Sequence, residues 1–177
     1  NLAANLSRIK GEYKRAAAAY DQALKLDGTR LDIVMNYAEM LVERSEYEKA
    51  RLLLDTIESA LDTAQSDAIR DALLHRTETL SLRIRNLTCT RHVCAGCGRE
   101  WWAPWIVENS PAIKVHGEPP GEAPAGKCES CGKIFCVACA SEHVVDSRLT
   151  CSECGDPLRL SDPGLRLIFS RVLEKNS

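Results

Sequence analysis

The chain lacks the features that would place it outside the cell or in a membrane. No hydrophobic signal segment opens it, and its apolar runs are too short to span a bilayer. The first 88 residues contain none of its 9 cysteines, unlike the spread of cysteines in a small disulfide-bonded secreted domain. We therefore expect a cytoplasmic protein from a reducing compartment.

A basic half and a recognisable catalytic set are also absent from the 177 residues. The formal net charge is −2, and charges of both signs are mixed along the chain, which argues against nucleic acid as a partner. No serine–histidine–aspartate set, carboxylate pair or phosphate-binding loop is evident. The sequence therefore favours a binding protein over an enzyme.

The second half does contain cysteine pairs separated by two residues. There are four such pairs: Cys94/Cys97, Cys128/Cys131, Cys136/Cys139 and Cys151/Cys154. Two cysteines at this spacing can present both sulfurs to one tetrahedral ion from a tight turn. The pattern predicts two structural zinc ions, because a catalytic zinc keeps one position open.

The spacing allows two ways of sharing eight thiolates between two ions. Sequential pairing gives two separate ribbons, each with few apolar residues to bury. Interleaved pairing joins the first pair to the third and the second to the fourth, and makes residues 132–135 a strut between the ions. We favour interleaving, and the spacing alone leaves both arrangements open.

Residues around the pairs add local predictions. Glycine follows three of the pairs, at Gly98, Gly132 and Gly155, and permits the positive φ that turns backbone amides toward the sulfurs. The third pair lacks this glycine, and we expect a helix there, near 139–145. Cys89, His92 and His143 have ligand-like positions, but eight cysteines already supply two sites.

Residues 1–60 contain an internal repeat with an offset of 34 residues. Residues 11–16 align with residues 45–50, and apolar side chains recur at helical spacing in both copies. Gly11 and Ser45 fall where one helix turns into the next, and residues 27–29 end the second helix. This offset is the period of a helix-turn-helix solenoid.

These features resemble the tetratricopeptide repeat. The resemblance is carried by Gly11, Tyr13, Ala16, Tyr20, Ala23 and Asp27, and in the next copy by Tyr37, Ala38, Tyr47, Ala50 and Leu54. Gly28 stands where the family usually has proline. The resemblance implies a groove for a peptide or helix of a protein partner, with Tyr13, Tyr37 and Tyr47 as candidate contacts. Because the first helix is short, we expect further repeats before residue 1.

The run from Cys128 to Cys139 resembles the centre of FYVE-type cross-brace zinc fingers in spacing, glycine and aromatic residue. That family interleaves its metals. The resemblance implies one zinc on Cys94, Cys97, Cys136 and Cys139, and the other on Cys128, Cys131, Cys151 and Cys154. Members that bind phosphoinositide carry a basic, histidine-containing run before the third cysteine. Residues 124–127 hold one lysine instead, which argues against a lipid partner.

RING-type ubiquitin ligases share the interleaved scaffold and supply an alternative function. They usually carry a bulky apolar residue in the first knuckle and an aromatic residue between the sixth and seventh ligands. Here the first knuckle holds Ala95 and Gly96, and no aromatic residue lies between Cys139 and Cys151. A ligase that recruits a conjugating enzyme through the zinc module is therefore the second interpretation.

Three further stretches complete the prediction. Trp101, Trp102 and Trp105 either form the core of the zinc module or bind a partner. Residues 117–126 are rich in proline and glycine, and this composition predicts a flexible loop. Helices are expected over 67–86, with Ser66 as its cap and Asp67 in its first turn, and after Asp162–Pro163, with Asp162 as cap.

We thus expect a mainly α protein with three parts. Residues 1–88 form tetratricopeptide-like hairpins, and residues 89–160 form a two-zinc treble-clef or cross-brace module with short β-hairpins. Residues 161–177 form a C-terminal helix that packs on the module or on the repeats. The expected function is that of an adaptor or scaffold subunit in a larger assembly.

Overall fold

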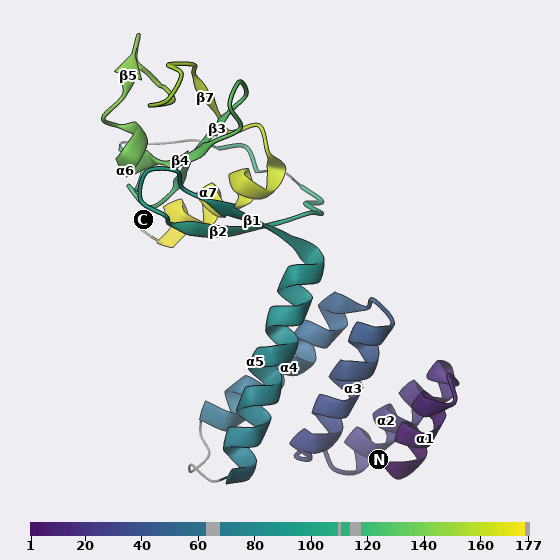
Figure 1. Ribbon diagram of the computed structural model, residues 1–177. Helices are drawn as coiled ribbons and strands as arrows, with labels where there is room; N and C mark the ends of the chain where they lie inside the picture. The colour runs from purple at the N-terminus through teal and green to yellow at the C-terminus, as the bar shows by residue number, and fades with distance from the viewer. Residues whose placement is uncertain (63–67, 110, 114–117, 176–177) are drawn as a thin grey trace. The chain divides into compact units, whose positions relative to one another are not determined.

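The computed structural model describes residues 1–62, 68–109, 111–113 and 118–175 (Figure 1). The chain forms two compact units, Asn1–Leu87 and Thr88–Ser177. The first unit is helical, and the second combines small sheets with a short helix and a terminal helix. No described helix combines the length and the apolar character needed to cross a membrane.

The first unit consists of two helical hairpins and one further helix. Its helices are α1 (Leu2–Ile9), α2 (Tyr13–Leu26), α3 (Leu31–Glu43), α4 (Tyr47–Asp62) and α5 (Ala68–Thr88), which ends just beyond the unit. Helix α1 pairs with α2, and α3 pairs with α4. The helix expected over 67–86 is present as α5, while its proposed cap Ser66 and Asp67 lie outside the described residues.

The two hairpins turn in the same way, 34 positions apart. The amide of Gly11 donates to the Arg8 carbonyl at 3.0 Å, and that of Glu12 to the Ser7 carbonyl at 2.8 Å. In the second hairpin, the amides of Ser45 and Glu46 make the equivalent bonds at 3.0 and 2.9 Å, to Val42 and Leu41. This pattern is a Schellman motif, which requires a left-handed residue after the helix. Gly11 and Ser45 supply it, at φ 75° and 61°.

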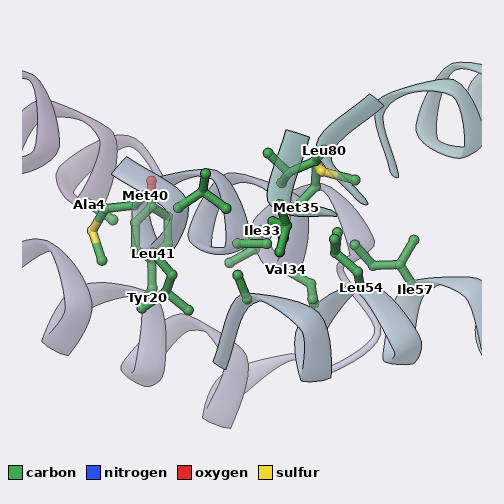
Figure 2. Packing of buried hydrophobic residues seen from close by; sticks show 14 of the residues in the cluster. Ala4, Tyr20, Ile33, Val34, Met35, Met40, Leu41, Leu54, Ile57 and Leu80 are labelled. Atoms are coloured by element: carbon green, nitrogen blue, oxygen red, sulfur yellow. The ribbon is translucent and has the colours of Figure 1, made fainter. Parts of the chain in front are cut away.

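Small side chains at equivalent positions let the helices of each hairpin approach closely. Ala4, Ala16, Ala38 and Ala50 are all fully buried, as the repeat pattern predicts. Larger side chains such as Tyr20, Met40 and Leu54 fill the spaces between the helices (Figure 2). Leu80 and Ile84 bring α5 into the same core. The described residues of this core are all aliphatic, methionine or tyrosine, so hydrophobic packing stabilises it.

The second unit is built from short antiparallel strands. These are β1 (Cys89–Val93), β2 (Glu100–Pro104), β3 (Pro124–Cys128), β4 (Ile134–Cys136), β5 (Val144–Val145), β6 (Arg148–Leu149) and β7 (Leu158–Arg159). They form a β1–β2 hairpin, a three-stranded sheet in the order β4–β3–β7, and a β5–β6 hairpin. Two helices, α6 (Val137–Ala140) and α7 (Pro163–Lys175), complete the unit.

Two local predictions for this unit were wrong. The loop expected to run to residue 126 gives way to β3 at Pro124, because this strand pairs with β4 on one side and β7 on the other. The helix expected near 139–145 is instead α6, over Val137–Ala140. It begins earlier because the Cys136 sulfur caps it, accepting the Cys139 amide at 3.4 Å. Val144 and Val145 then form β5 rather than helix.

The terminal helix begins as the sequence predicts. The Asp162 carboxylate accepts the backbone amide of Leu165 at 2.9 Å, which satisfies one free donor of the first turn. Helix α7 packs on β2, where a Cβ on Gly164 would lie 2.8 Å from the Ala103 side chain. Leu165 and Phe169 are buried, so α7 belongs to the core of the second unit.

Replacing Gly11 with alanine should destabilise the first unit by about 1 kcal/mol, because an L-residue in the left-handed region is strained. A Cβ there would contact nothing within 4 Å, so the effect isolates the backbone conformation. Gly28→Ala is the matched control, since its φ lies outside the positive range. Urea unfolding followed by far-UV circular dichroism measures both, and equal stabilities for the two variants would contradict the assignment.

Candidate metal centres

The eight paired cysteines gather into two groups of four sulfurs. One group contains Cys94, Cys97, Cys136 and Cys139, and the other contains Cys128, Cys131, Cys151 and Cys154. Within each group the sulfurs lie within 4.8 Å of one another, so both groups are positioned to hold a metal ion. The first cysteine pair joins the third and the second joins the fourth, which is the interleaved arrangement.

Three of the four pairs are presented by the same backbone turn. The amides of Cys94, Cys128 and Cys151 each donate to the carbonyl five residues later, at 2.7, 2.8 and 2.8 Å. The amides of Gly98, Gly132 and Gly155 donate back to those cysteines' carbonyls at 3.0, 2.9 and 2.9 Å. All three glycines have φ of 75–76°, as their position after the pair predicts. The turn therefore holds both sulfurs of a pair on one side.

The link between the second and third pairs connects the two groups. Ile134 packs with Cys94 and Cys136 of the first group, whereas Phe135 packs with Cys128 and Cys151 of the second. Successive side chains of a strand point to opposite faces, which explains how neighbouring residues serve different groups. The Ala95 amide also donates to the Ile134 carbonyl at 2.8 Å, tying the first knuckle to the link.

Backbone amides aimed at the sulfurs favour thiolates. The Cys131 amide lowers the pKa of Cys128 to about 7. Burial raises the pKa of Cys94, but the amides of Cys97 and Cys136 outweigh it and bring this pKa to about 7. The Cys136 sulfur in turn raises the pKa of Cys139 well above its ordinary value. Backbone amides thus favour a thiolate at Cys94 and at Cys128, and a neighbouring sulfur disfavours one at Cys139, so a bound cation would stabilise the ionised sulfurs.

The other candidate ligands lie outside both groups. Cys89 is partly exposed at the start of β1, and His143 is exposed beyond α6. His92 pairs with Trp101 across the β1–β2 hairpin. Its Nε2 atom is buried without a hydrogen-bond partner among the described residues, and burial lowers the pKa of this imidazole.

The three tryptophans occupy different environments. Trp101 is only 6% exposed, and its Nε1 donates to the Glu122 carbonyl at 3.2 Å. Trp105 is 61% exposed, although its Nε1 donates to the Thr90 hydroxyl at 2.9 Å. Trp102 is intermediate. Trp101 therefore belongs to the core of the second unit, and partner binding by the exposed Trp105 stays a prediction.

The first unit carries a cavity of about 430 Å³ across three helices. It is lined by Arg8 of α1, Glu39 and Glu43 of α3, and His75, Arg76, Thr79, Leu80 and Arg83 of α5. We call it the α1–α3–α5 cavity. The candidate tyrosines lie elsewhere: the ring of Tyr37 stacks on that of Tyr20 at 5.1 Å, and Tyr13 lies 5.3 Å beneath the Arg44 guanidinium. Tyr47 is partly buried against the hydrophobic core. The helical spacing of apolar residues in the sequence did not identify the polar residues that line the α1–α3–α5 cavity.

Double substitutions can test the sharing of thiolates between two ions. Cys94→Ser with Cys136→Ser should remove one metal ion per chain, because both residues belong to the same group. Cys94→Ser with Cys128→Ser should remove two. Sequential pairing predicts the reverse, so native mass spectrometry of the two variants distinguishes the arrangements. Cys89→Ser is the matched control and should keep the full metal content.

Comparison with known proteins finds similarity in the first unit. The tetratricopeptide repeat family model matches residues 8–72, which include α2, α3, α4 and the start of α5. No curated protein and no solved structure matches the chain significantly. The helical unit is thus similar to tetratricopeptide repeats, a type of domain that generally binds protein partners.

Proposed function

We propose that the chain is a protein–protein interaction adaptor in a larger assembly, with a repeat unit that binds a partner and a zinc unit that holds a rigid second surface. The α1–α3–α5 cavity carries this proposal: Arg8, Glu39 and Glu43 of its lining lie in the part of the chain similar to tetratricopeptide repeats, and α5 completes the lining with residues that follow this part. Stacked helical hairpins offer such hollows to a peptide or a helix.

The chemistry of the two cysteine groups supports zinc as their metal. Four thiolates suit a borderline-soft ion with tetrahedral preference, and a closed set of four protein ligands is typical of structural sites. Zinc–sulfur bonds of about 2.3 Å in a tetrahedron place sulfurs about 3.8 Å apart. The observed separations are 3.8 Å for Cys97–Cys136, 3.4 Å for Cys128–Cys154 and 3.5 Å for Cys131–Cys151.

The zinc ions would supply much of the folding free energy of the second unit. Its buried residues fall into three small clusters, and cysteines form part of two of them. A core of this size stabilises a domain only marginally, so small domains often depend on metal. Exposed side chains on the same unit, above all Trp105, would then be held in fixed positions as further partner contacts.

Removal of the metal should unfold the second unit and leave the first folded. All three tryptophans lie in the second unit and all four tyrosines lie in the first, so tryptophan emission reports on the zinc module alone. A strong zinc chelator should shift tryptophan emission to longer wavelength while most helical circular dichroism remains. Restored emission on adding zinc is expected, and unchanged emission in fully demetallated protein would contradict a structural role.

A bulky side chain in the α1–α3–α5 cavity should abolish partner capture. Thr79→Trp places an indole within the cavity lining, whereas Glu78→Trp puts the same side chain outside that lining on the same helix. Quantitative affinity capture with the full chain should show at least a tenfold loss of specific partners for Thr79→Trp only. Equal capture by both variants would contradict binding in this cavity.

A ubiquitination assay with a panel of ubiquitin-conjugating enzymes tests the second interpretation. Robust formation of ubiquitin chains would favour a ligase over an adaptor.

A further inference from the structure

We infer that the α1–α3–α5 cavity selects an acidic segment of its protein partner, whose carboxylates bind Arg76 and Arg83. This inference rests on the proposed function, since it names the chemistry of the ligand for the same site. Three arginines and one histidine line the cavity, against two glutamates. The balance of lining charge is therefore positive in a chain whose formal net charge is −2.

Both cavity glutamates are already paired with arginine. Glu43 accepts two hydrogen bonds from Arg8, from Nε at 3.0 Å and from Nη2 at 2.5 Å. Glu39 lies between two arginines, accepting from Arg8 at 3.4 Å and from Arg76 at 2.6 Å. Arg8 and Arg76 thus offset part of this negative charge, and Arg83 is the lining arginine that engages neither glutamate.

Two arginines keep donors for a ligand. Arg76 uses Nη2 for its bonds to Glu39 and Asn36, which leaves other N–H groups of a five-donor guanidinium. Arg83 is exposed and, within the described part of the chain, makes no ion pair. Thr79 lies on the same face of α5 between them, and its hydroxyl donates to the His75 carbonyl at 2.8 Å. A guanidinium binds a carboxylate with two parallel hydrogen bonds, a geometry that a lysine partner could not provide.

The separation of the arginines defines the spacing of the ligand. Arg76 and Arg83 are seven residues apart on one helix, which corresponds to about 10.5 Å along its axis. An extended peptide advances about 3.3 Å per residue, so same-face carboxylates two or four residues apart bracket this distance. Flexible glutamate side chains can adjust to the remaining difference. An extended segment with alternating acidic residues therefore offers carboxylates at spacings on either side of the distance between the two arginines.

A peptide fits this lining better than a nucleic acid does. Glu39 and Glu43 would repel a chain of phosphates, which has no cation to place opposite them. A peptide can bring lysine, arginine or backbone amides to those carboxylates and acidic side chains to Arg76 and Arg83. The mixture of charges in the cavity thus favours a polypeptide of predominantly acidic character.

The test uses the zinc-loaded full chain and three fluorescein-labelled peptides of twelve residues. In these peptides alanine alternates with glutamate, with glutamine or with lysine, and fluorescence anisotropy at low salt gives the Kd. The glutamate peptide should bind most tightly. Arg83→Gln should weaken it about two- to fivefold, as expected for loss of an exposed charge pair. Arg85→Gln removes the same charge outside the cavity lining and should leave the Kd unchanged.

The possible results separate this inference from the proposed function. Equal binding of the glutamine or lysine peptide, or equal effects of the two arginine substitutions, would overturn the acidic preference. Tighter binding of a twelve-nucleotide oligothymidine that depends on Arg83 would overturn it in favour of nucleic acid. If no peptide binds while Thr79→Trp still abolishes partner capture, the acidic preference fails and the proposed adaptor function stands.

Discussion

Mutual repulsion among thiolates is the constraint on which the second unit depends. Eight sulfurs are drawn into two groups by knuckle turns that also aim backbone amides at them. Those amides favour the charged form at Cys94 and Cys128, while the close approach of neighbouring sulfurs opposes it at Cys139. A cation at the centre of each group would remove this conflict, because it would stabilise all four thiolates together.

The repeat unit depends on a different interaction, the close packing of helices at alanine positions. This packing could be predicted from the sequence, because Ala16 and Ala50 recur at the same offset as Tyr13 and Tyr47. The turn could be predicted as well, since Gly11 can adopt the left-handed conformation without strain. Ser45 shows that the hydrogen bonds of the turn are sufficient to hold a non-glycine residue there. Local rules thus determine this unit almost completely.

The fold of the second unit was less accessible from sequence, for a physical reason. Cysteine spacing predicts the knuckle turns because each is closed by hydrogen bonds within six residues. The strand at Pro124–Cys128 has no such local signal, since it pairs with β4, which follows the second cysteine pair, and with β7 near residue 158. The short α6 likewise depends on a side-chain cap. The Cys136 sulfur accepts a hydrogen bond from the Cys139 amide. Long-range pairing and sulfur contacts therefore override the composition of these segments.

The polar lining of the α1–α3–α5 cavity was missed because repeat patterns identify the residues that hold helices together, which are buried. Lining residues are free to vary between copies: Glu39 of α3 lines the cavity, whereas Asn5, its equivalent in α1, is uncharged and is not among the lining residues. Glu39 reduces the net positive charge of the cavity, yet its bonds to Arg8 and Arg76 restrain both side chains. A restrained guanidinium loses less conformational entropy when it binds a carboxylate than a free one does. Glu39 can thus lower the attraction for an acidic ligand while making that ligand's binding more specific in geometry, so the cavity is better suited to recognise a spacing of charges than to collect anions in general.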